Sequence, residues 1–403
     1  MAERSRLFPL ALFVLVIVAA SGAAIGATSG VTVASTFPVG DSGGASADGQ
    51  LDESEIVYLS PAAQDVGQED YEQTGLDVSS AVAGDVQRLH GNFDKLAFEE
   101  RQATFDDPDE REAFISETNE DIVDRIQTLD AHSERLIREH NEGELSTGAL
   151  VREFLRLDIG ASQHRSFAEY VNQFSSDDTI PNAVEEELVM LSNPVADELE
   201  ATARGDEPGR SVYVQTSDDA LVLAISGTEH LRQATLRGER DIGGDDQFEQ
   251  GDDGRIPAAI ERTNELYPWA SLSSIGTVFR APGVYQVQMT HDYTDLEIYL
   301  DGATTEVFHE IQWVQSTSVP VSSTTTNTTA ALELTVEATD PTGPMHVSVV
   351  DATTGDPVEA TVSIDDQPVG TTDDGELWVT QPRGNFEVTV TTPEGETVTV
   401  TGP

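Results

Sequence analysis

The chain contains no cysteine and only one lysine, Lys95, among its 403 residues. The lack of cysteine excludes disulfides, thiolate metal sites, a cysteine nucleophile and a lipidated N-terminal cysteine. Aromatic residues make up 6% of the chain and hydrophobic residues 38%, which favours small cores or some unstructured segments. No Gly-x-Ser-x-Gly elbow, phosphate-binding loop or dinucleotide fingerprint is present, so the sequence offers no catalytic residue and no cofactor-binding residue.

Acidic residues dominate what the chain does contain. There are 74 Asp and Glu against 21 Lys and Arg, a net charge of −53. Residues 332–403 carry 14 of the acidic residues and a single arginine, so the excess is not confined to an acidic tail that binds cations or basic partners, which is the alternative. Such a surface repels itself in dilute buffer, whereas at molar salt the screening length shrinks to roughly 3 Å. The composition predicts a halophilic protein, and it excludes nucleic acid as a partner because no basic face exists.

The N-terminus has the layout of an export signal. Arg4 and Arg6 precede an apolar run that continues in small residues to Ala27. Because residues 7–27 are also just long enough to span a bilayer, residues 1–28 are expected to be a signal peptide or an N-terminal membrane anchor. We therefore expect an extracellular or cell-surface location, with membrane contact only through residues 7–27 if the segment is not cleaved.

Helical patterns fill the first half of the remaining chain. Residues 29–54 are rich in Gly, Ser, Ala and Asp and are expected to be a flexible linker. Residues 55–206 are expected to be a helical domain, in which a helix that starts at Pro108 carries an apolar residue every seven positions from Ile115 to Leu136. The next helix alternates steps of four and three from Leu150 to Val171, which is typical of a coiled coil. The segment is predicted to be a helical bundle or a long helical hairpin.

The period changes to two beyond about residue 206. Residues 207–316 combine alternating strands with one helix around 256–266 and are expected to be a mixed α/β domain. Residues 317–331 form a Ser/Thr-rich linker by composition, and residues 332–403 alternate in short strands separated by turns, as in a small all-β sandwich. The predicted fold class is therefore multidomain α+β.

Two turns near the C-terminus carry a resemblance. Thr354-Gly355-Asp356-Pro357-Val358 and Thr372-Asp373-Asp374-Gly375 resemble the turns of the carboxypeptidase-regulatory-like (transthyretin-like) sandwich, over roughly the last 60 residues. This resemblance implies an accessory, non-catalytic module. The layout of the whole chain, with Leu266-Tyr267-Pro268-Trp269 and Tyr299-Leu300-Asp301-Gly302, is similar to a haloarchaeal exported family of unknown function, which brings no assigned activity.

Three groups of residues are candidates for sites. Oxygen ligands of the kind that Ca²⁺ prefers crowd the acidic loop that contains Asp245, Asp246, Asp252 and Asp253, although the loop lacks EF-hand spacing and a solvated loop is the alternative. Tyr267 and Trp269 predict an exposed aromatic docking patch or, alternatively, core packing. Asn327 belongs to the one N-glycosylation sequon of the chain.

The remaining chemistry-bearing residues favour no site. Ser226 and His230 are residue types of a serine hydrolase, but closeness in sequence is not geometry. His164 falls on the predicted helical seam, where packing is expected, and His291 and His309 lie in or beside strands, where we expect surface positions.

These observations favour an exported halophilic envelope protein with a non-enzymatic binding, scaffolding or spacer role. Its expected partner is an unidentified envelope protein or a glycan, and no cofactor is expected beyond the Ca²⁺ candidate. The alternative is a secreted hydrolase or sugar-active enzyme with its site in residues 207–316. A sensor ectodomain is a third possibility, weakened because no output domain follows the apolar segment.

Overall fold

The computed structural model describes residues 58–175, 184, 187–248, 254–270, 275–281 and 283–402, of which 275–281 by backbone alone. One strand precedes the long helices along this part of the chain, and most of the strands follow them. In chain order the elements are η1 (Ala63–Asp65), β1 (Gln68–Gln73), α1 (Val78–Gln102), α2 (Pro108–Asn141), α3 (Thr147–Asn172), η2 (Val189–Leu191), α5 (Pro194–Arg204), β2 (Ser211–Thr216), β3 (Ala220–Ile225), β4 (Glu229–Leu236), η3 (Arg237–Glu239), α6 (Arg255–Leu266), η4 (Pro268–Ala270), β5 (Ile275–Ala281), β6 (Val284–His291), β7 (Thr294–Asp301), β8 (Val307–Gln315), β9 (Ser323–Thr328), β10 (Leu332–Ala338), β11 (Pro344–Asp351), β12 (Thr361–Ile364), β13 (Gln367–Thr371), β14 (Glu376–Thr380), β15 (Glu387–Thr391) and β16 (Thr397–Thr401). Within the described residues, no helix is both long and apolar enough to cross a bilayer, and the apolar run at 7–27 lies outside them.

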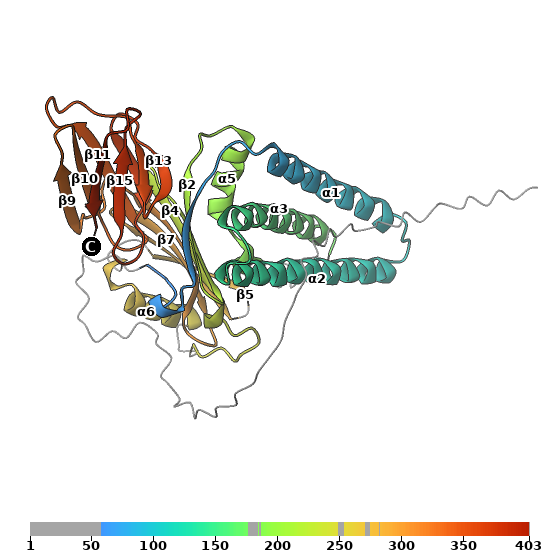
Figure 1. The fold of residues 1–403 in the computed structure, drawn as a ribbon. Helices are drawn as coiled ribbons and strands as arrows, with labels where there is room; N and C mark the ends of the chain where they lie inside the picture. The colour runs from blue at the N-terminus through green and yellow to red at the C-terminus, as the bar shows by residue number, and fades with distance from the viewer. Residues whose placement is uncertain are drawn as a thin grey trace, which may run out of the picture. The chain divides into compact units, whose positions relative to one another are not determined.

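The long helices begin where the sequence supplies caps. The side chains of Asp77, Asp107 and Ser146 accept backbone N–H groups at the starts of α1, α2 and α3. Pro108 occupies the first turn of α2, as predicted, and Gly143 follows the end of that helix with a φ of 74°, a conformation that favours glycine. Figure 1 shows the three helices side by side in one layer.

An eight-stranded antiparallel sheet forms the centre of the fold. Its order is β1-β2-β3-β4-β8-β7-β6-β5. Strand β1 corrects the expectation that residues 55–206 are helical throughout, because Gln68–Gln73 pairs along its length with β2. The sequence of β1 is almost entirely polar, and its residues are only partly buried, so neither alternation nor hydrophobicity marks it as a strand.

The helices and the sheet share one hydrophobic core. Leu136 and Ile137 from α2, together with Leu150 and Phe154 from α3, pack against the sheet face that carries Val212, Val214, Leu221, Leu223, Ile311 and others. Strand β3 is buried at every position because both faces of the sheet are covered there. The expected boundary near residue 206 thus falls between two parts that are packed as one body.

The C-terminal module is a sandwich of two four-stranded antiparallel sheets, β14-β11-β10-β9 and β13-β12-β15-β16, as predicted. Their inward side chains, among them Leu334, Val347 and Val388, form a core of their own. Strand β9 is a correction, because Ser323–Thr328 was expected to belong to a linker over 317–331. These polar residues pair in register with β10, and at a sheet edge the backbone hydrogen bonds hold a strand without help from apolar side chains.

Candidate functional site

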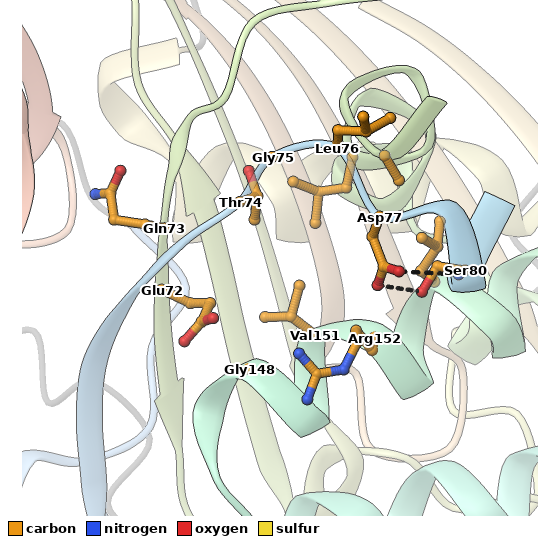
Figure 2. Close-up of a pocket in the computed structure, with 13 residues that line it drawn as sticks. Glu72, Gln73, Thr74, Gly75, Leu76, Asp77, Ser80, Gly148, Val151 and Arg152 are labelled. Carbon is orange, nitrogen blue, oxygen red and sulfur yellow. Dashed lines mark hydrogen bonds between the residues drawn. The ribbon is translucent and has the colours of Figure 1, made fainter. Parts of the chain in front are cut away.

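A pocket of about 220 Å³ lies where the connection from β1 to α1 passes the start of α3 and the end of α5. Figure 2 shows Glu72 from β1, Asp77 from the cap of α1 and Arg152 from α3 around it. Leu76, Val151, Leu155, Leu199 and Ala203 supply the apolar part of its lining. A pocket with an apolar wall and a few charged groups is the usual form of a small-molecule site.

The acidic groups of this pocket are held by neighbouring residues of the chain. The carboxylate of Asp77 accepts the hydroxyl of Ser79 at 2.6 Å and that of Ser80 at 2.8 Å, and these bonds lower the pKa of Asp77 to about 2. Ser80 therefore donates to a carboxylate whose lowered pKa makes it a weak base. The carboxylate of Glu72 packs on Gly148 in the first turn of α3, where a Cβ atom would lie 2.5 Å from Glu72 Oε1. The pocket could hold a small amphipathic molecule with a charged end.

A second polar cluster is buried where strands β4 and β8 meet. Arg232 Nη1 donates to Glu310 Oε1 at 3.0 Å, and both side chains are completely buried. Burial raises the pKa of Glu310 above its usual value although the Arg232 guanidinium lowers it, and burial also lowers the pKa of Arg232. A buried ion pair offsets its desolvation cost only when further hydrogen bonds engage its remaining donors and acceptors.

Arg232 and Glu310 also form hydrogen bonds with residues from other parts of the chain. Arg232 donates to the carbonyl of Leu59 at 2.5 Å in the N-terminal segment and to Thr342 Oγ1 at 3.0 Å in the C-terminal module. Glu310 accepts the backbone N–H of Leu59 at 3.1 Å and the hydroxyl of Tyr267 at 2.5 Å. These contacts join three parts of the chain, and the cluster therefore acts as a structural junction.

The sandwich is attached to the sheet by further polar contacts beside this junction. Tyr71 in β1 donates its hydroxyl to the carbonyl of Thr380 at 2.6 Å and its backbone N–H to Gln367 Oε1 at 3.0 Å. Arg383 donates its backbone N–H to Glu69 Oε1 at 2.8 Å and its guanidinium to the carbonyl of Pro61 at 2.7 Å. The segment 58–73 thus lies between sheet and sandwich and bonds to both.

Ser226 and His230 come together but do not form a catalytic pair. Ser226 Oγ lies 2.8 Å from His230 Nδ1 and 3.0 Å from Thr380 Oγ1. Burial, with the Arg232 charge, lowers the pKa of His230 to about 3, and the ring is completely buried. A triad histidine is oriented by a carboxylate, whereas the charged neighbour of this ring is a cation that opposes protonation. The pair joins β4 to the sandwich.

Two further histidines, His309 and His140, are buried and have structural contacts. His309 was expected at the surface and is instead completely buried, with Thr235 Oγ1 at 2.8 Å from its Nδ1, because β8 is covered on both faces. Burial lowers the pKa of His309 to about 3. His140 in α2 lies between Thr216 and Thr147 at 2.8 and 3.1 Å. Both rings fill polar positions inside the core.

The prediction of an exposed aromatic docking patch at Tyr267 and Trp269 is wrong. Tyr267 and Trp269 are 4% and 2% exposed and belong to the core between α6 and the sheet. Tyr267 is held there by its bond to Glu310, and Trp269 packs edge-on against it with ring centroids 6.4 Å apart. Core packing, the alternative that the sequence left open, is the one observed.

The calcium candidates fall partly outside the described residues, since Asp252 and Asp253 are not among them. The carboxylate of Asp246 is already engaged, because it accepts Tyr285 Oη at 2.6 Å and pairs with Arg255 at 3.2 Å. In the part of the chain that the structure describes, no cluster of three or more His, Asp or Glu side chains could hold a metal, Asp245 included. A calcium site in this loop stays a prediction.

Asn327 lies exposed on the edge strand β9, where its side-chain N–H donates to the carbonyl of Thr399 at 2.7 Å. A glycan on Asn327 would have to replace this bond to β16. Its use as a glycosylation site remains a prediction.

The sequence missed both the pocket and the buried pair, but a signal for the pair was present. Arg232 is the one charged residue of its strand apart from Glu229 at the exposed start, and Glu310 stands beside buried Phe308 and Ile311 in a strand that had been predicted. A charge within an apolar strand marks a buried partner, whereas nothing in the sequence places Glu72 near Arg152.

Family models match the chain in three consecutive stretches. Residues 212–320 match a Family of unknown function (DUF7094), and residues 323–399 match the Archaeal fibronectin-III type-like domain. No curated protein and no solved structure matches the chain. The matches fit an archaeal protein of unknown function with a C-terminal β-sandwich, and the resemblance to the carboxypeptidase-regulatory-like sandwich stays a prediction. Residues 5–208, just over half of the 403, match the remaining model, and the chain therefore belongs to the family described as Domain of unknown function (DUF7096).

Proposed function

We propose that this protein is a non-enzymatic scaffold or spacer of the archaeal cell surface that works in molar salt. The observation that carries the proposal is the buried junction around Arg232 and Glu310. It joins the N-terminal segment, the sheet and the sandwich into one body, and residues 47–403 form a single compact unit. A spacer needs such stiffness, because three modules on flexible linkers would not hold a fixed orientation relative to one another.

A second observation that supports a non-enzymatic role concerns the ionisable residues of the sheet. Three residues of the sheet that could act as acid or base, His230, His309 and Glu310, are buried and used in structural bonds. The pocket beside Glu72 and Arg152 offers binding groups, so a protein or glycan of the envelope is the partner class we propose. The basic residues and apolar run at the N-terminus and the net charge of −53 support export into brine.

Surface exposure can be tested with a single thiol, because the chain has no cysteine. Ile242 is 60% exposed, so Ile242→Cys places one reactive group on the outside of the fold. The variant is produced in an archaeal host that grows in molar salt, and intact cells are treated with a membrane-impermeant maleimide. Labelling in intact cells supports the proposal, and labelling only after lysis contradicts it. Wild-type chain provides the background control.

The enzymatic alternative is tested in the same preparation. Ester and glycoside substrates are assayed with wild-type chain and with Ser226→Ala. Turnover that is lost in Ser226→Ala would replace the proposed scaffold with a hydrolase, and equal background for both proteins supports the scaffold.

A further inference from the structure

Helix α1 turns most of its large apolar side chains away from the protein, and Phe98 is the buried exception. Seven residues in and just before the helix are between 44% and 69% exposed, and we call them the outer stripe: Leu76, Val78, Val82, Val86, Leu89, Phe93 and Leu96. Exposed apolar residues that stand alone are ordinary, but a continuous row of this length marks an interaction site.

Small residues on the inner face of α1 fix this orientation. Gly84 and Gly91 face α3, and a Cβ atom on Gly84 would lie 2.8 Å from Ile159 Cδ1. A Cβ atom on Gly91 would lie 2.5 Å from Gln163 Oε1. The helix therefore lies close to α3 at these two positions, and a larger residue there would require Ile159 or Gln163 to move. The glycine face of α1 is thus the face that packs on α3, and the larger side chains lie on the other side.

The outer stripe has the spacing of a helix seam. From Val82 to Leu96 the steps alternate between four and three residues, as the two core positions of a coiled-coil heptad do. The stripe runs along most of a helix of 25 residues. This pattern favours another helix as the occupant of the stripe, because a flat surface would not require the heptad period.

The charge of α1 favours a partner surface that carries little net charge. The helix contains four acidic and three basic residues, whereas α2 contains ten acidic and four basic residues. Asp85 beside the stripe is paired with Arg88 at 3.1 Å and with Arg204 at 2.7 Å. The stripe is therefore a nearly neutral strip on a chain of net charge −53, and it is suited to an equally apolar and neutral surface.

The size of the stripe suits a second copy of the same stripe. Seven half-exposed side chains of this kind expose roughly 100 Å² each, so the stripe offers roughly 700 Å² of apolar surface. Two such stripes bury roughly 1,400 Å² in total, which lies within the range of stable protein interfaces. A two-fold pair needs one self-complementary surface, and the stripe is one.

We propose that α1 is a dimerisation helix whose outer stripe packs antiparallel against the outer stripe of a second copy of this chain. In this arrangement Val82 faces the partner's Phe93, and Val86 faces the partner's Leu89. The antiparallel direction follows from Glu99 and Glu100, which stand at the C-terminal end of α1. It places these carboxylates beside the positive end of the partner helix, whereas a parallel pair would set them against each other.

The oligomeric state in about 3 M KCl tests the proposal, because the screening length there is only a few ångströms and repulsion between the acidic copies is suppressed. Sedimentation equilibrium of the full chain should give a dimer. Leu89→Glu combined with Phe93→Glu should weaken the dimer by at least ~100-fold, since it places charges in the seam. Ile242→Glu combined with Val321→Glu alters exposed apolar residues elsewhere and should leave the dimer intact. Far-ultraviolet circular dichroism checks that all variants keep their helix content.

A monomeric wild-type chain at about 100 µM, where a dimer of micromolar affinity would be nearly complete, would overturn the proposal. A dimer that survives the seam variant would do the same. Either result would leave the stripe to another occupant, such as the chain's own residues 7–27 or a different protein.

Cross-linking tests the antiparallel direction, again because the native chain has no cysteine. Val82→Cys and Phe93→Cys chains are oxidised separately and after mixing. Disulfide-linked dimers that form only in the mixture support the antiparallel pair. Efficient linking of Val82→Cys with itself would contradict that arrangement.

Discussion

Glu310→Gln should destabilise the protein strongly, although it changes the side chain by a single atom. The substitution removes the negative charge beside Arg232 and leaves a guanidinium with no counter-ion in a completely buried site. It also turns an amide N–H or an amide oxygen toward groups that are arranged for a carboxylate, namely the hydroxyl of Tyr267 and the backbone N–H of Leu59.

The magnitude follows from the burial. Removing one partner of a buried ion pair costs about 3–5 kcal/mol, because the remaining charge keeps its full desolvation penalty. With an unfolding entropy of about 2 cal/mol/K per residue over the compact unit 47–403, the thermal midpoint should fall by roughly 4–7 °C. Replacing both Arg232 and Glu310 with Met should recover most of this loss, since no unpaired charge remains.

Thermal unfolding followed by circular dichroism in molar KCl measures these shifts. Arg125 and Asp94 form a matched exposed pair at 3.4 Å, and Arg125→Met should change the free energy of unfolding by at most about 0.5 kcal/mol. A Glu310→Gln midpoint within 1 °C of wild type, or a double variant no more stable than the single one, would refute the argument that an uncompensated buried charge sets the cost.

Three further predictions concern single sites. Burial, with the Asp197 charge, raises the pKa of Asp158 to about 8. The protonated carboxyl therefore contributes fully to stability below pH 3.8, and this contribution is lost as the pH rises through 8. Asp158→Asn should raise the urea midpoint at pH 9 and leave it unchanged near pH 3.5. The pKa values of His230 and His309 are lowered to about 3. The neutral rings therefore contribute fully to the stability of the fold above pH 6.5, and this contribution is lost as the pH falls toward 3. His309→Gln should make the urea midpoint less dependent on pH between pH 7 and pH 4.5 than it is in wild type. Trp269→Ala should cost about 3–5 kcal/mol of unfolding free energy in urea titrations because the ring is buried, whereas an equal midpoint would restore the idea of a surface residue.

The sequence predicted the helices and strands that are determined by local signals such as caps and hydrophobic periodicity. Pro108 and Ser146 mark helix starts, and the apolar residues from Ile115 to Leu136 mark the buried side of α2, because caps and the 3.6-residue period act within a few residues of chain. The alternating strands of the sandwich follow from the period of two in the same way, and the α+β class follows from both.

The sequence failed where the partner of a segment decides its structure. Strands β1 and β9 are polar, and each forms because a neighbouring strand offers a free edge, which no local pattern records. Helix α1 shows the opposite difficulty, since it carries two regular stripes and the sequence alone does not say that the stripe of glycines faces the core. Tyr267 and Trp269 illustrate the same limit, because an aromatic pair fits a core and a docking surface equally well until burial is known.

The overall charge sets the conditions under which all these contacts persist. Even if every Lys and Arg were paired with a carboxylate, 53 acidic groups would remain without a counter-ion on the protein. At about 0.1 M salt the screening length is roughly 10 Å, so neighbouring carboxylates repel one another across the surface, whereas at about 1 M it is roughly 3 Å and the repulsion is confined to direct neighbours. The ellipticity of the folded chain should therefore decrease as KCl or NaCl is diluted from molar concentration to about 0.05 M. A fold that keeps its full ellipticity at the lowest salt would show that the buried contacts around Arg232 and the shared core outweigh the repulsion, and the halophilic interpretation of the composition would then have no basis.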